Sequence, residues 1–280
     1  MTDQLDPYAY PGSSVLRNKP GIVDAALLAK FEYEQSAIRM QEMRAKPVPG
    51  RLDLQHLQAI HRTIFQDVYD WAGEIRTVSI SKGSSRFAEP AYIPSEAAKL
   101  TAALAGERNL QGLDKRQFVD RLSHYYAEWN ALHPFREGNG RSTRELMGEI
   151  ARQAGYELDQ TRIENSKGQW NEAARQSFGG RLAPVTAIFT DAIRPSRSLA
   201  FETLTEREAL ARHPELSGAY EGLAELRSEY EKRYPDDDDQ RKRFEAQTRA
   251  EIVRVLDTGA LLQGTRDRVP PARERKSMER

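Results

Sequence analysis

The sequence contains no cysteine. This absence excludes disulfide bonds and thiolate metal sites and suits a reducing compartment, so we expect the cytoplasm, either of the producing cell or of a host or recipient cell after delivery. Long apolar runs are also missing, and no stretch approaches the ~20 apolar residues that a membrane-spanning helix needs. The first thirty residues lack the basic start and unbroken apolar run of a signal peptide. We therefore expect a soluble protein with no membrane partner.

A net charge is absent as well. The 280 residues include 42 lysines and arginines and 42 aspartates and glutamates. Without an overall basic field, long-range attraction to nucleic acid has no support, and we expect no direct nucleic-acid binding. Hydrophobic residues make up 39% and charged residues 30% of the chain, which is typical of a globular protein. The length predicts one well-cored domain plus an accessory element.

Strand signals are scarce. Only residues 76–93, RTVSISKGSSRFAEPAYI, combine alternation of apolar and polar residues with a turn sequence, which is typical of a short hairpin. Elsewhere apolar residues recur at helical spacing. Helices are expected over residues 23–43, 53–69, 95–105, 116–132, 141–155, 171–178 and 184–193. The sequence therefore predicts an all-α fold with one small β-hairpin.

Composition shifts toward charge near residue 200. Pro195 marks the expected end of a main domain over residues 1–195. Two apolar stripes on either side of the acidic run at 235–240 predict a C-terminal helical hairpin over 200–263. Consecutive aspartates suit a solvated turn and a helix N-terminus better than a calcium loop, which needs spaced ligands. Residues 264–280 are Pro-rich and basic, which predicts a disordered tail.

One segment carries a chemical pattern, HPFREGNGRSTR at residues 133–144. Gly138, Asn139 and Gly140 stand directly before an expected helix. Backbone amides in such a loop can point at one anion while the helix dipole favours negative charge. These three residues are therefore a candidate phosphate cradle.

Four other side chains of this segment suit work on a nucleotide. Arg141 and Arg144 are three residues apart and share a helix face, which places two guanidinium groups beside the cradle. Glu137 offers the hard carboxylate that Mg²⁺ accepts when its other ligands are water and phosphate oxygens. His133 has an ordinary pKa near neutrality and can take a proton from an attacking hydroxyl. Each feature alone is often structural, but their order within twelve residues indicates nucleotide chemistry.

The same twelve residues resemble the active-site motif of the Fic family, His-x-Phe-x-(Asp/Glu)-Gly-Asn-Gly-(Arg/Lys)-x-x-Arg, at every specified position. Upstream, DPYAYPGSSVLRNK and IFQDVYDWAGEIRTVSISKGSSRFAEPAYI are similar to the opening and flap regions of Fic proteins from bacterial toxin and effector systems. The resemblance covers about residues 6–194. It implies the Fic helical fold and a protein adenylyltransferase that uses ATP and Mg²⁺.

The resemblance also implies roles for single residues. His133 would deprotonate a Tyr, Thr or Ser hydroxyl of a target protein, which would attack the α-phosphate of ATP while pyrophosphate leaves. Glu137 would help to hold magnesium. Asn139 and the amides of Gly138 and Gly140 would stabilise the charge that develops on the transferring group.

Further implied roles concern the phosphates, the core and the target. Arg141 and Arg144 would hold the β- and γ-phosphates, and Phe135 would anchor the loop in the core. The hairpin at about 77–88 would be a flap that clamps an extended target segment by strand addition. Its expected contact residues are Ser81, Lys82, Gly83 and Phe87. A capping hairpin without a substrate role is the alternative.

Two other functions stay open. One is a phosphotransferase like the Doc relatives of the same superfamily, which depart from this motif at the second glycine of the cradle, whereas Gly140 is present here. The other is a non-catalytic interaction module that keeps the fold.

His56 and His61 are five residues apart and do not align as two zinc ligands on one helix face. The three tryptophans are expected as core residues or domain-surface anchors: Trp71, Trp129 and Trp170.

An always-open site would be toxic to the cell that makes it, and Fic proteins are commonly restrained by an inhibitory helix with the pattern (Ser/Thr)-x-x-x-Glu-(Gly/Asn). The match here is SGAYEG, with Ser217, Glu221 and Gly222. In this interpretation Glu221 pairs with Arg144 and excludes the γ-phosphate. Packing of the same helix explains the segment equally, and restraint by a separate small antitoxin protein is the alternative.

Overall fold

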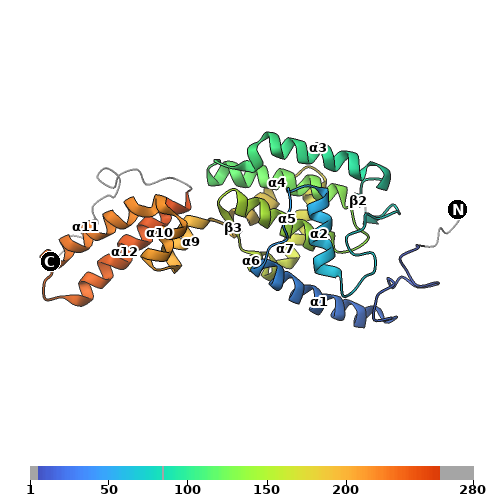
Figure 1. The fold of residues 1–280 in the computed structure, drawn as a ribbon, viewed down its shortest axis with the longest axis horizontal. Coiled ribbons are helices and arrows are strands. Elements are labelled where there is room, and N and C mark those ends of the chain that lie inside the picture. Colours follow the sequence, from blue (N-terminus) through green and yellow to red (C-terminus); the bar gives the residue numbers. More distant parts are fainter. Residues whose placement is uncertain (1–5, 84, 259–280) are drawn as a thin grey trace, which may run out of the picture. The chain divides into compact units, whose positions relative to one another are not determined.

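The computed structural model describes residues 6–83 and 85–258 (Figure 1). The chain divides into two compact units, and the boundary falls between Ile193 and Arg194. Each unit has its own hydrophobic cluster. Because the two units are separate bodies, each is described by itself.

Helices make up most of the first unit. Its α-helices are α1 (Ala25–Ala45), α2 (Leu54–Phe65), α3 (Ile93–Gly106), α4 (Lys115–Leu132), α5 (Asn139–Gln153), α6 (Gln160–Asn165), α7 (Lys167–Phe178) and α8 (Ala183–Ala192). Two 3-10 turns, Pro90–Tyr92 and Arg108–Leu110, flank α3. The expected all-α class is confirmed, although α6 was not predicted because six residues are too few to show a helical period.

Aspartates begin the helices that carry the main domain. Asp24 and Asp53 accept hydrogen bonds from the first-turn amides of α1 and α2. Asp114 forms a reciprocal capping box with Gln117 at the start of α4. Such caps satisfy amides that lack a partner within the helix. Local sequence therefore fixes where these helices begin.

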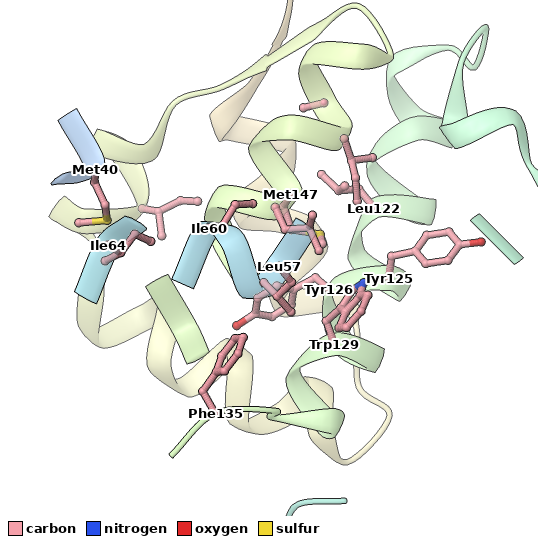
Figure 2. Close-up of a cluster of buried hydrophobic side chains, with 14 of the residues drawn as sticks. Met40, Leu57, Ile60, Ile64, Leu122, Tyr125, Tyr126, Trp129, Phe135 and Met147 are labelled. Carbon is pink, nitrogen blue, oxygen red and sulfur yellow. The ribbon is translucent and has the colours of Figure 1, made fainter. Parts of the chain in front are cut away.

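The core of the first unit lies where α4 packs against α5, α7 and α8, and where α2 packs against α1 and α5. Figure 2 shows the cluster, with Trp129, Tyr125 and Tyr126 of α4 near residues of α2 and α5. Trp71, Trp129 and Trp170 are all buried, as expected of core residues. The packing of α4 and α5 holds the loop between them, residues 133–138, at the edge of this core.

Four short strands form two sheets. In the predicted hairpin, β1 (Ser81–Lys82) and β2 (Ser85–Arg86) pair antiparallel, with Ser81 opposite Arg86. A second two-stranded sheet joins β3 (Tyr156–Leu158) and β4 (Ile193–Pro195). The sequence did not predict this second sheet, because three-residue strands are too short to show alternation.

The second unit contains more helix than the predicted hairpin. The two predicted helices are α11 (Ser217–Arg233) and α12 (Asp238–Asp257), which pack against each other. Before them come α9 (Ser196–Thr203), α10 (Glu206–Arg212) and a 3-10 turn at Pro214–Leu216. These short helices were not predicted, since seven or eight residues hold only two turns.

The acidic run of the second unit adopts the expected turn and cap. Asp237 accepts a hydrogen bond from the amide of Gln240 and begins α12. Asp238 pairs with Arg241 and Lys242 one turn later. The tail predicted at 264–280 lies outside the described residues. Within the described part, no helix is long and apolar enough to cross a membrane.

Candidate active site

His133 ends helix α4. It is the C-cap residue, in the left-handed region at φ 47°, which few non-glycine residues adopt. Its Nδ1 lies 3.1 Å from the carbonyl oxygen of Asn130. Because a carbonyl only accepts, Nδ1 carries the hydrogen of the neutral ring, and Nε2 keeps a free lone pair. Burial lowers the pKa of His133 to about 4, with the charges of Arg76 and Lys82 adding to the shift, so the ring is neutral at physiological pH.

Phe87, which was predicted as a target contact, packs on this imidazole. Its ring stacks on that of His133 with centroids 3.7 Å apart and planes inclined by 14°. The ring is buried and also contacts Phe178 edge-on. Phe87 therefore supports the imidazole of His133, and its contact with a target stays a prediction.

Gly138 is a position that the fold restricts to glycine. Its φ is 79°, and an added Cβ would lie 2.3 Å from Cε2 of Phe65. The amide of Gly138 donates to Oε1 of Glu137, 2.9 Å away, rather than pointing outward as the cradle model expects. Gly140 differs, because an added Cβ would meet only the guanidinium of Arg144 at 3.6 Å, an ordinary contact.

Asn139 closes the loop with its side chain. The amide of Phe135 donates to Oδ1 of Asn139 at 2.8 Å, and Nδ2 donates back to the carbonyl of Phe135 at 2.7 Å. Phe135 is fully buried, as expected of an anchor. Both ends of the Asn139 carboxamide are thus used to shape the loop. The anion-binding groups left are the amides of the first turn of α5, which have no acceptor within the helix.

Arg141 is held by helix α1. Its guanidinium donates to the carboxylate of Glu32 and, at 3.0 Å, to the hydroxyl of Ser36. The same group lies 4.6 Å from the ring centroid of Phe65. Tyr69 donates its hydroxyl to the second oxygen of Glu32. The expected phosphate role of Arg141 stays a prediction, because a carboxylate already neutralises this cation.

Arg144 is different. Its side chain is partly buried, and this burial lowers the pKa of the guanidinium. Among the residues that the structure describes, no carboxylate lies within 4 Å of it, and it donates no hydrogen bond to them. Its Cζ lies 5.8 Å from the ring centroid of Trp170. Withdrawing a cation from water without an anion costs free energy, so this group is suited to bind a phosphate.

Glu137 is the candidate magnesium ligand. Its side chain is 49% exposed, and only Oε1 accepts the bond from Gly138. Within the described part, no group of three or more His, Cys, Asp or Glu side chains could hold a metal ion. The site thus fits Mg²⁺ only when nucleotide oxygens and water complete its shell, which is the usual mode for this ion.

His61 of helix α2 supports the loop through a hydrogen bond and a ring contact. Its Nδ1 accepts from the amide of Gly73, so Nε2 donates to the carbonyl of Glu137 at 2.9 Å. The ring packs on Phe135 with centroids 3.9 Å apart. Burial lowers the pKa of His61 to about 3, so the ring stays neutral. His56 bonds instead to the backbone of Leu52 and Val48, and both histidines therefore serve structural roles.

Three polar residues of this neighbourhood could not be predicted from the sequence as parts of the site: the buried His61 and Arg76 and the partly buried Glu32. They lie outside the motif, and their residue types alone signal nothing. Their burial and bonding partners, which only the folded chain reveals, identify them.

The remaining flap residues lie at the surface. Ser81, Lys82 and Gly83 are all exposed, and an added Cβ at Gly83 would meet nothing within 4 Å. An exposed two-residue strand presents unpaired backbone groups to an incoming strand. The predicted role in target binding stays a prediction that this exposure supports.

The predicted inhibitory residues belong to the second unit. Ser217 begins α11, Glu221 is exposed on it, and Gly222 is buried. The expected helix is therefore present. The pairing of Glu221 with Arg144 stays a prediction.

Comparisons with known proteins agree with this site. A family model described as Fic/DOC family matches residues 51–151. The chain is 42% identical over 192 residues to the probable protein adenylyltransferase Fic of Salmonella typhimurium, over 69% of this chain and 94% of that protein. It is also 42% identical over 183 residues to the protein adenylyltransferase VbhT of Bartonella schoenbuchensis, over 65% of this chain but 38% of VbhT.

A solved structure of a Bartonella effector is also similar to this chain. The BepC protein of Bartonella tribocorum, a VirB-translocated effector crystallised with AMPPNP, matches with a TM-score of 0.62 at 27% identity. The match covers 67% of this chain and 96% of that one. The chain therefore belongs to the Fic/DOC family. The shared name of its sequence relatives places it among the protein adenylyltransferases of that family.

Proposed function

We propose that this chain transfers AMP from ATP to a Tyr, Thr or Ser hydroxyl of a target protein, with His133 as general base and pyrophosphate as leaving group. The observation that carries the proposal is the state of two partly buried groups of the motif. His133 is held neutral, with its Nε2 lone pair not used by the bond to Asn130, and Arg144 is a cation that bonds to no anion among the described residues. A base beside a phosphate-binding cation is what this transfer needs.

The bonds change as follows. Nε2 of His133 takes the proton of the target hydroxyl, whose oxygen forms a bond to the α-phosphorus. The bond from that phosphorus to the bridging oxygen breaks, and pyrophosphate leaves. The hydrogen bond from Nδ1 to Asn130 holds the ring in the required tautomer and helps to stabilise the imidazolium that forms.

The phosphates would lie over the start of α5. The amides of its first turn and the helix dipole favour negative charge there, and Arg144 would hold the terminal phosphate. Glu137 would hold Mg²⁺, which neutralises charge on the phosphates when bound. The absence of a side chain at Gly140 leaves the backbone open to a phosphate, although the fold itself does not require glycine there.

The hairpin would bind the target. Its exposed strand β1 can add an extended target segment by main-chain hydrogen bonds, which places a hydroxyl without strict dependence on sequence. Phe87 connects this function to the base, because it follows β2 directly and stacks on His133.

Labelled ATP tests the proposal. The purified chain is incubated with a bacterial or host lysate and either α-labelled or γ-labelled ATP, and labelled proteins are identified. Labelling from the α-position alone supports AMP transfer. Labelling from the γ-position would favour the Doc-like phosphotransferase, and labelling from neither would favour the non-catalytic module.

Restraint of the site is a separate question. If Glu221 acts within the chain, Glu221→Gly should raise self-labelling by α-labelled ATP severalfold, because Arg144 becomes available to the γ-phosphate. The exposed neighbour Glu225→Gly on the same helix is the matched control. An unchanged rate in Glu221→Gly would overturn restraint within the chain and favour an accessory interaction role for this helix, with a separate antitoxin protein as the alternative restraint.

A further inference from the structure

Arg76 is a buried arginine outside the motif. Its side chain is 1% exposed, and within the described residues no carboxylate lies within ion-pairing distance of it. Every hydrogen bond of its guanidinium goes to a main-chain carbonyl: Val78 at 2.7 Å, His133 at 2.8 Å, Leu132 at 3.3 Å, and Ala88. A buried cation is retained at such cost only where its bonds are needed.

These carbonyls belong to two regions that are distant in the sequence, the hairpin region and the end of helix α4. Val78 and Ala88 are the two ends of the hairpin region, and Leu132 and His133 are the end of helix α4. Main-chain bonds add to the same junction, since the amide of Arg76 donates to Pro134 and that of Ala88 donates to Ala131. The negative end of the α4 dipole also favours a cation here.

The junction controls the position of the base. His133 adopts a left-handed conformation that costs energy, and Nε of Arg76 holds its carbonyl in that conformation. Phe87 is adjacent to Ala88, so any movement of Ala88 also moves the ring that stacks on the imidazole. A lysine also has three N–H donors, but all three lie on a single nitrogen. It therefore lacks the planar fork with which Nε and both terminal nitrogens of Arg76 reach these separate carbonyls.

We propose that Arg76 is a positioning residue for AMP transfer, which fixes the spacing between His133 and both ends of the target-binding hairpin. The inference rests on the proposed function. Arg76 bonds to neither the first turn of α5 nor Arg144, so nucleotide binding should not depend on it.

The test compares Arg76→Lys with the wild-type full chain. We expect kcat for labelling of a protein acceptor by α-labelled ATP to fall roughly 100-fold, because a small displacement of a catalytic group has an effect of this size. Affinity for AMPPNP, measured by calorimetry, should stay within about threefold. Arg39→Lys is the matched control, because Arg39 also has its guanidinium bonded but to Asp67 and Glu42, and both values should be unchanged.

Other outcomes overturn the inference. Wild-type kcat in Arg76→Lys would do so. If that variant does not bind AMPPNP, Arg76→Met replaces it, and loss of binding in both would show a requirement for folding rather than positioning.

A further measurement separates this inference from the proposed function. The NMR cross-peak between the rings of Phe87 and His133 should be present in the wild type and weakened in Arg76→Lys, whatever reaction the chain catalyses. An unchanged cross-peak would overturn the positioning role. A wild-type chain that labels no acceptor would instead overturn the proposed function alone.

Discussion

The loop at 133–138 and the hairpin at 81–86 meet where Phe87 stacks on His133, but they are built in opposite ways. The loop is fixed from every side: Phe135 is fully buried, Asn139 closes it, and His61 holds the carbonyl of Glu137. The strands of the hairpin are two residues long and their described side chains are exposed. The hairpin ends, by contrast, are tied to the loop through Arg76.

This difference matches what the proposed function would require each region to bind. Phosphate chemistry gains most from donors and a base that are already in position, since reorganisation would use up their electrostatic advantage. A protein target requires an accessible edge that accepts varied side chains. The predictions below therefore expect large effects on chemistry and stability in the loop, and small effects confined to the target in the hairpin.

The largest effect is expected from His133→Ala. Removal of the base should lower kcat for AMP transfer by a factor of about 100 to 10,000, with ATP affinity within a few-fold, because a general base acts in the transition state. Labelling kinetics and calorimetry measure the two quantities. The exposed His124→Ala on the same helix is the control and should be silent.

Dependence on pH gives an independent check of this base. The ring must be neutral to act, so wild-type kcat/KM should fall only as pH drops through about 4. A fall of kcat/KM near pH 6.5 that is present in the wild type and absent in His133→Ala would contradict the lowered pKa of this ring.

Substitution of the two motif arginines should have different effects, one on ATP affinity and the other on stability. Arg144→Ala should weaken ATP binding about 10- to 100-fold without loss of stability, because it removes a partly buried cation that pairs with no carboxylate of the described residues. Arg141→Ala should lower the free energy of unfolding by about 1 to 3 kcal/mol, because the partly buried carboxylate of Glu32 then loses its cation and keeps only the hydrogen bond from Tyr69. Calorimetry and chemical denaturation measure the effects. Equal loss of ATP affinity in a fully stable Arg141→Ala would show that phosphate binding is its main role.

Substitution of the two cradle glycines, Gly138 and Gly140, should also have different effects on stability and ATP affinity. Gly138→Ala should lower the free energy of unfolding by roughly 2 to 4 kcal/mol, because it combines a strained φ with a clash against Phe65. Gly140→Ala should change stability by less than about 1 kcal/mol and yet lower ATP affinity about tenfold, since its Cβ would occupy the path of a phosphate. Denaturation curves and calorimetry decide. A stable Gly138→Ala would mean that the loop is less rigid than described.

The smallest effect is expected in the hairpin. Lys82→Ala should raise KM for the protein target severalfold, with ATP affinity unchanged and stability within about 0.5 kcal/mol, because the side chain is exposed. Target-titrated labelling measures it, and the exposed Lys99→Ala on α3 is the control. A large loss of ATP affinity in Lys82→Ala would break the division between loop and hairpin.

The sequence by itself predicted the longer helices and the hairpin, which the structure contains, and it presents the candidate reactive groups within residues 133–144. Periodicity and aspartate caps act over one or two turns, so they can be read locally, and the motif places its reactive groups within twelve residues. The sequence did not predict the short elements, because they hold too few residues for any period to appear; these are α6, α9, α10, β3 and β4.

Only the tertiary structure decided which groups of the motif are engaged and which are free. The sequence presents Arg141 and Arg144 as equals. In the structure Glu32, more than a hundred residues away, pairs with Arg141, whereas Arg144 pairs with no carboxylate of the described residues. It presents Arg76 as one charge among many, and burial makes it the link between the base and the hairpin. The physical reason is that the energy of a charge depends on its solvent exposure and its partners, and in these cases the helix packing sets both.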